Sequence, residues 1–98
     1  MASRNDAGRI EWLRKGAEQG NVFAQFNLGV AYLKGNGVER NFIEAFKWLY
    51  LAETRGYDDA PAIRDALQKK IAPDDLARAR TACRQWQDDF EKRMKRKT

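Results

Sequence analysis

Apolar residues recur at helical spacing along most of the chain. From residue 41 to 54, for example, Phe42, Ala45, Phe46, Leu49 and Ala52 fall at positions i, i+3, i+4, i+7 and i+10. This spacing places them on one face of a helix. Strand-like alternation of apolar and polar residues does not occur at any useful length, so the pattern predicts an all-α fold.

Glycine and proline divide the pattern into about five helices. They are predicted over residues 6–19, 22–34, 41–54, 58–70 and 73–95. Gly20, the Gly35-Asn36-Gly37 segment and Gly56 follow the first three, and glycine adopts the positive φ at which helices commonly end. Pro61 and Pro73 fall in first turns, where a missing N–H is harmless.

The sequence also repeats itself at a spacing of 36 residues. Trp12-Leu13 recurs as Trp48-Leu49, and the same shift carries Gly20 onto Gly56. Repetition of a helix-then-glycine unit predicts stacked antiparallel helix pairs, each of which buries its apolar face against its neighbours.

Residues 17–56 resemble the Sel-one-like repeat (SLR), a relative of the tetratricopeptide repeat. The resemblance is carried by Ala17-Glu18-Gln19-Gly20-Asn21, Ala24-Gln25-Phe26-Asn27-Leu28-Gly29, Tyr32, Gly35, Gly37, Val38, Ala45, Trp48, Ala52 and Gly56. It implies an α/α superhelix of antiparallel helix pairs, a short tetratricopeptide-like solenoid that serves as an adaptor or scaffold for protein partners.

The chain is expected to form one domain over residues 1–98. Its parts are a half-repeat helix (6–20), a full repeat (22–56), a degenerate repeat helix (58–70) and a capping helix with a basic tail (73–95). The motif decays after residue 56, because Gly29 and Tyr32 map onto Asp65 and Gln68. The first helix matches the second helix of a repeat whose own first helix is missing.

The resemblance places a partner in the groove lined by the first helix of each pair. The implied binding residues are Phe23, Phe26, Asn27, Val30, Leu33, Lys34, Lys69 and Lys70. The four apolar ones form a second stripe on a helix that already has a core face. This stripe is either core beneath neighbouring helices or an exposed patch for a partner peptide or a second copy. A groove apolar at one end and basic at the other would suit a peptide with a hydrophobic anchor and acidic residues.

The net charge of +5 comes from the C-terminal end of the chain. The five cations of this basic tail are Lys92, Arg93, Lys95, Arg96 and Lys97, and the remaining residues are 14 basic and 14 acidic. The tail is interpreted either as a solvated helix end favoured by the helix dipole or as a contact for nucleic acid or an anionic surface. Without interleaved aromatic residues, a nucleic-acid function is the weaker alternative.

The inventory of reactive residues argues against catalysis. Histidine is absent, which removes His-based acid–base chemistry and most zinc sites. The single cysteine, Cys83, is predicted to be buried and inert. Adjacent carboxylates on a helix point about 100° apart, so Asp58 and Asp59 are predicted to cap the fourth helix rather than to act as a catalytic pair. We expect a protein that is not an enzyme, with no cofactor or metal.

No apolar stretch is long enough to span a membrane, and no signal peptide is visible. A cytoplasmic location is therefore expected. The resemblance implies a bacterial adaptor, and a role as a regulator or antagonist of its partner extends this hypothesis. Self-association into a homodimer through the first helix and the second stripe is a further hypothesis.

Overall fold

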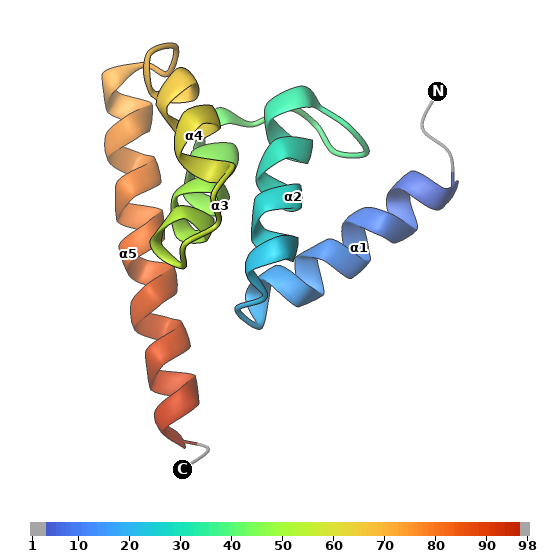
Figure 1. The fold of residues 1–98 in the computed structure, drawn as a ribbon, viewed down its shortest axis with the longest axis vertical. Coiled ribbons are helices and arrows are strands. Elements are labelled where there is room, and N and C mark those ends of the chain that lie inside the picture. The colour runs from blue at the N-terminus through green and yellow to red at the C-terminus, as the bar shows by residue number, and fades with distance from the viewer. Residues whose placement is uncertain (1–3, 97–98) are drawn as a thin grey trace.

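The computed structural model describes residues 4–96, with side chains from residue 8 onward. It contains α1 (Arg4–Glu18), α2 (Val22–Lys34), α3 (Phe42–Thr54), α4 (Ala60–Gln68) and α5 (Pro73–Arg96), as Figure 1 shows. No strand occurs within these residues. Every helix begins and ends within two residues of its predicted bounds, and the prediction of an all-α helical repeat is confirmed.

The helices form a short stack. From α2 to α5, successive helices run in opposite directions, and α3 packs against α2, α4 and α5 (Figure 1). The first helix, α1, packs mainly against α2 and diverges from the other helices. None of the helices within the described residues is long and apolar enough to cross a membrane.

The turns that follow α1 and α3 have the same hydrogen bonds. After α3, the N–H of Gly56 donates to the carbonyl of Glu53 at 2.9 Å, and that of Tyr57 donates to Ala52 at 3.1 Å. After α1, the N–H groups of Gly20 and Asn21 donate the corresponding hydrogen bonds. Both glycines have positive φ, 90° for Gly20 and 87° for Gly56. This is the Schellman motif, and the 36-residue repeat therefore extends to backbone geometry.

Asparagine residues begin two of the helices. The side chain of Asn21 accepts a hydrogen bond from the Ala24 N–H at 2.8 Å, and that of Asn41 does the same for Glu44 at 3.1 Å. The predicted cap of α4 is wrong for Asp59, whose side chain makes no capping bond. Its backbone is already helical, with φ −83° and ψ −13°, whereas a capping side chain needs an extended residue.

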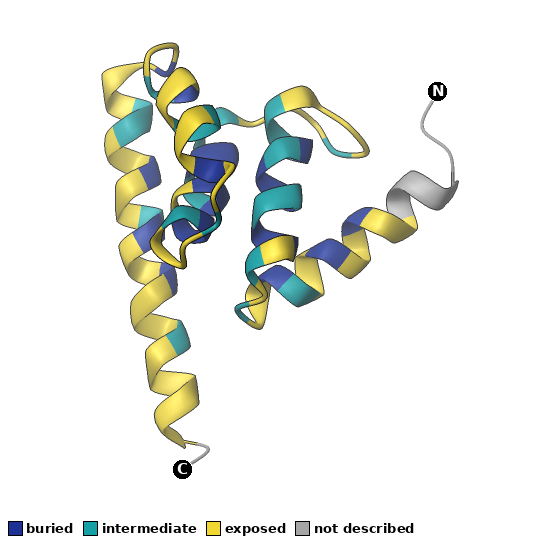
Figure 2. Ribbon diagram, viewed as in Figure 1, coloured by how far each residue is buried: buried dark blue, intermediate teal, exposed yellow. Residues whose placement is uncertain are grey.

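Two apolar clusters form the core. The first contains Ile10, Leu13, Ala17, Ala24, Leu28, Ala31, Trp48, Leu51, Cys83 and Trp86. The second contains Ala45, Phe46, Leu49, Leu67, Ile71 and Ala79. Figure 2 shows that the buried residues lie on the sides of the helices that face one another.

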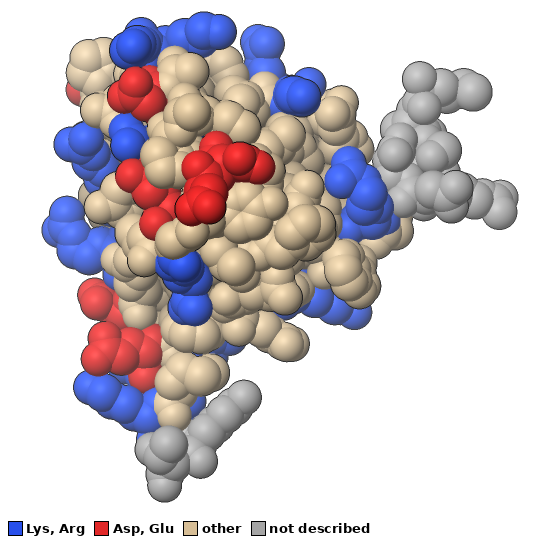
Figure 3. Space-filling view, in the orientation of Figure 1, with Lys and Arg blue, Asp and Glu red and all other residues tan. Residues whose placement is uncertain are grey.

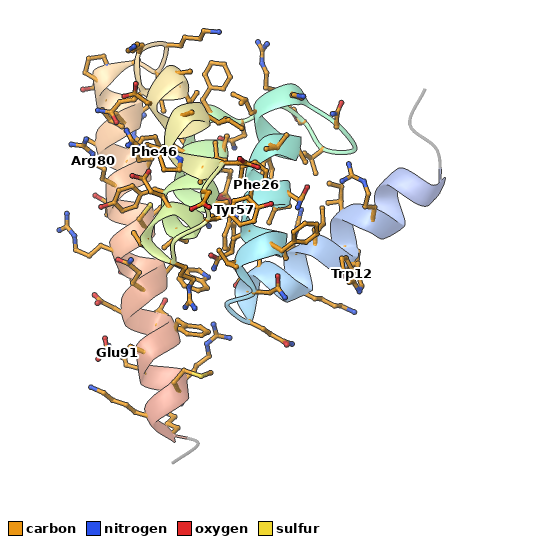
Figure 4. All side chains as sticks on the ribbon, viewed as in Figure 1. Trp12, Phe26, Phe46, Tyr57, Arg80 and Glu91 are labelled. Atoms are coloured by element: carbon orange, nitrogen blue, oxygen red, sulfur yellow. The ribbon has the colours of Figure 1, made fainter. Side chains whose placement is uncertain are left out.

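The repeat-related tryptophans Trp12 and Trp48 differ in environment. Trp48 is 2% exposed and meets Trp86 edge-on at 5.8 Å, whereas Trp12 is 67% exposed and projects from α1 (Figure 4). The same residue type at the same repeat position is thus core in one helix and surface in the other.

The far end of α5 reaches back to the turn between α1 and α2. The indole N–H of Trp86 donates to Glu18 Oε1 at 3.3 Å, and Arg93 donates to the Glu18 carbonyl at 2.9 Å. The ring of Phe90 lies on Gly20, where an added Cβ would come within 2.7 Å of Phe90 Cζ. These contacts join parts of the chain that are about 70 residues apart.

Candidate partner-binding surface

The predicted groove corresponds to the face formed by α2 and α4. Phe23, in the first turn of α2, is 54% exposed. Phe26, Val30 and Leu33 are half-buried and pack against the second core cluster. The stripe is therefore partly core and partly exposed patch. Phe26, Val30 and Leu33 each pack one side against the core, whereas Phe23 projects into solvent.

Tyr57 completes this face, and the sequence analysis did not include it. Its ring stacks on Phe26 with 4.4 Å between the ring centroids and 21° between the planes. Figure 4 shows the two residues side by side between α2 and α4. The available signal was the position after Gly56, because the residue that follows the glycine of a Schellman motif commonly makes an apolar contact.

The amide of Asn27 is engaged within its own helix. Its Nδ2 donates to the carbonyl of Phe23 at 2.8 Å. One of the two amide donors of this side chain is therefore used at the exposed end of the stripe. This bond also links Asn27 to the backbone that carries the Phe23 ring.

Charges surround the apolar patch. Lys34, Lys69 and Lys70 are exposed near the C-terminal ends of α2 and α4, and Lys69 lies 3.7 Å from a carboxylate oxygen of Asp65. Figure 3 shows acidic side chains beside a broad uncharged area over α2. The basic end that the sequence predicted is thus partly neutralised by Asp65.

Arg64 of α4 is not a free cation on this face. Its guanidinium donates to both oxygens of Glu53, at 2.8 and 3.2 Å, and to Gln68 at 2.8 Å. The hydrogen bonds that Arg64 donates to the Glu53 carboxylate are the largest cause of the raised pKa of Arg64. Arg64 therefore ties α4 to α3 instead of being available to a partner.

Some cations of the basic tail already contact other groups of the protein. Arg93 binds the Glu18 carbonyl and lies over the Phe90 ring, 5.6 Å from its centroid. Lys95 lies 3.3 Å from Glu91. Lys92 and Arg96 are exposed, and Lys97 lies outside the described residues.

The one thiol is buried. Cys83 donates to the carbonyl of Lys47 at 3.5 Å, and burial raises its pKa to about 12. Because the thiolate is the reactive form, this cysteine is a poor nucleophile at neutral pH. Within the described residues, no cluster of three or more His, Cys, Asp or Glu side chains could hold a metal ion.

Comparison with known proteins places the chain in a family. The model of the Sel1 repeat matches residues 10–21 and 22–57, and the second match covers α2 and α3. Among solved structures, the chain is similar to a protective antigen present in uropathogenic Escherichia coli strains that displays an SLR fold. The TM-score is 0.77, and the identity is 33% over 83% of this chain and 18% of that one.

The chain thus spans about a fifth of the length of that antigen. A comparison with curated protein sequences finds no match. Sel1 repeats are generally protein–protein interaction modules, and their fold is a non-catalytic scaffold. The repeat match and the shared fold together show that the chain belongs to the Sel1-like repeat proteins.

Proposed function

We propose that this protein is an adaptor that binds a peptide segment of a partner protein on the α2/α4 face. The observation that carries the proposal is the exposure of Phe23, 54%, beside the half-buried Phe26. An exposed aromatic ring next to a continuous apolar surface is the usual form of a protein-binding patch.

The geometry of this face supports the choice of occupant. The stacked rings of Phe26 and Tyr57 form a floor that the core holds in place from below. A rigid apolar floor loses little conformational entropy when a ligand covers it. Lys34 and Lys70 lie near one end of the face. A peptide with an apolar anchor followed by acidic residues therefore fits this surface, and capture of such a segment would make the protein a regulator or antagonist of its partner.

The test uses peptides selected for binding from a random displayed library. We expect Phe23→Asp to weaken the selected peptide by at least about tenfold, because it removes the exposed anchor contact. The matched control is Trp12→Asp, which places the same charge at another exposed aromatic residue, on α1. It should leave the dissociation constant within about twofold. Circular dichroism checks that both variants are folded.

Two results would contradict the proposal. The first is equal loss of binding in both variants, which would make the interaction unspecific for the α2/α4 face. The second is light scattering that shows a dimer of the unmodified protein and a monomer of Phe23→Asp. A second copy of the chain would then occupy the face instead of a peptide.

A further inference from the structure

A second surface with binding chemistry lies between α3 and α5. It is a hollow of about 250 Å³ lined by Tyr50, Arg80, Cys83, Arg84 and Gln87. Tyr50 forms one wall, and its ring is held by stacking on Phe46 with 5.9 Å between centroids. Cys83, also in the lining, is buried, and its thiol is already bonded to the carbonyl of Lys47.

Two arginines line the hollow on the α5 side. Arg80 and Arg84 are one turn apart, so they lie on the same face of the helix. Both are exposed, and neither forms an ion pair within residues 4–96. Figure 3 shows basic side chains along the edge that α5 forms, and Figure 4 shows Arg80 projecting from it.

Few acidic residues lie near these arginines in the sequence, and the nearest one after them, Asp88, follows Arg84 by one turn. Residues 76–87 contain three arginines and no Asp or Glu. Arg78 is paired with Asp75 at 3.1 Å, whereas Arg80 and Arg84 form no ion pair among the described residues. Like charges at i and i+4 destabilise a helix, and an anion bound between them would remove that cost.

We propose that this hollow binds a carboxylate side chain in an acidic segment of the partner protein. Guanidinium groups match a carboxylate by two parallel N–H···O bonds, and Gln87 adds amide donors beside them. The proposal adds a contact surface distinct from the α2/α4 face. It depends on that face neither for its geometry nor for its test.

A protein ligand fits better than a nucleic acid. The volume of about 250 Å³ admits a side-chain-sized group. Along α5, the next turns carry Asp88, Asp89 and Glu91, which would repel a continuous phosphate backbone. A carboxylate at the end of a side chain can enter the hollow while its own backbone stays away from these acidic residues, whereas the charges of a nucleic acid lie in the backbone itself.

The probe is fluorescein-labelled hexaglutamate, and its affinity is measured by fluorescence anisotropy at low ionic strength. We expect the double variant Arg80→Gln/Arg84→Gln to bind at least about tenfold more weakly than the unmodified protein. The matched control, Lys92→Gln/Arg96→Gln, removes the same charge from the same helix beyond the hollow. It should lose less than about threefold.

Several outcomes would overturn the proposal. These are failure of hexaglutamate to bind the unmodified protein, equal losses of affinity in the two double variants, and tighter Arg80-dependent binding of a single-stranded hexathymidylate.

Nuclear magnetic resonance gives a second measurement on the unmodified protein. Hexaglutamate should shift the Tyr50 ring and Gln87 amide signals, and shifts confined to residues 92–96 would also overturn it. Phe23→Asp should bind hexaglutamate normally, so that failure of one proposal is distinguishable from failure of the other.

Discussion

Gly20 and Gly56 occupy the same position in two turns of the same type, and they differ in the side chains that cover them. Gly20 and Gly56 have φ of 90° and 87° and the same Schellman hydrogen bonds. A Cβ on Gly56 would meet no atom within 4 Å, whereas one on Gly20 would lie 2.7 Å from Phe90 Cζ and 3.0 Å from Cε1. The two alanine variants therefore separate the cost of backbone strain from the cost of the contact with Phe90.

The expected losses follow from these distances. Alanine at positive φ costs about 1–2 kcal/mol, and this cost should apply to both variants. Carbon atoms normally approach to about 3.5–4.0 Å, so in Gly20→Ala the Phe90 ring must move by about 1 Å. That movement disturbs its stacking on Trp86, at 4.8 Å. Overpacking costs about 1–3 kcal/mol in a core, and we expect about 1–2 kcal/mol here because Phe90 is only half-buried.

Urea unfolding followed by circular dichroism measures both variants. Gly20→Ala should be less stable than Gly56→Ala by about 1–2 kcal/mol, or about 5–15 °C in Tm for a domain of this size. In a Phe90→Ala background, the difference between the two variants should vanish, as expected for coupled neighbours. Equal stability of the two single variants would refute the packing of Phe90 on Gly20.

Further predictions concern two glycines and the buried thiol. Gly29→Ala should destabilise by about 1–2 kcal/mol, because its Cβ would lie 2.9 Å from Leu49 Cγ and 3.1 Å from the Leu49 backbone nitrogen, which cannot rotate away. Gly8→Ala meets nothing within 4 Å and should stabilise by about 0.5–1 kcal/mol; equal denaturation midpoints would contradict both. Cys83 in the native protein should react with a thiol reagent at pH 8 about 1,000-fold more slowly than after unfolding, because burial raises its pKa from 9.0 to about 12. The stability linked to its neutral thiol should be intact below pH 9 and decline as the pH rises toward 12, and rapid labelling without unfolding would be inconsistent with its burial.

The fold was predictable because its signals are local. The bounds of α2, residues 22–34, follow from an asparagine cap, an apolar run and Gly35. The family resemblance rests on similar short-range spacing. Asp59 shows the limit of such signals, because a capping residue type does not cap when the preceding turn gives it a helical backbone.

The binding surface was harder to predict because exposure depends on residues distant in sequence. The periodicity of α2 treats Phe23 and Phe26 alike, yet only Phe26 is covered by Tyr57, 31 positions away. The hollow beside Arg80 requires Tyr50 from a different helix. Neither pairing has a periodic signature, since each arises from the way the helices pack.

The contacts of Glu18 with Trp86 and Arg93 bear on how the chain unfolds. In a linear repeat array each unit touches only its neighbours, so the ends can open one unit at a time. Here α5 bonds directly to the end of α1, which joins the outermost elements of the stack. Loss of α1 would therefore also remove contacts of Trp86 and Arg93 in the C-terminal half of α5. We expect the amide hydrogens of these two helices to exchange with solvent together, as one cooperative unit and not as two independently fraying ends.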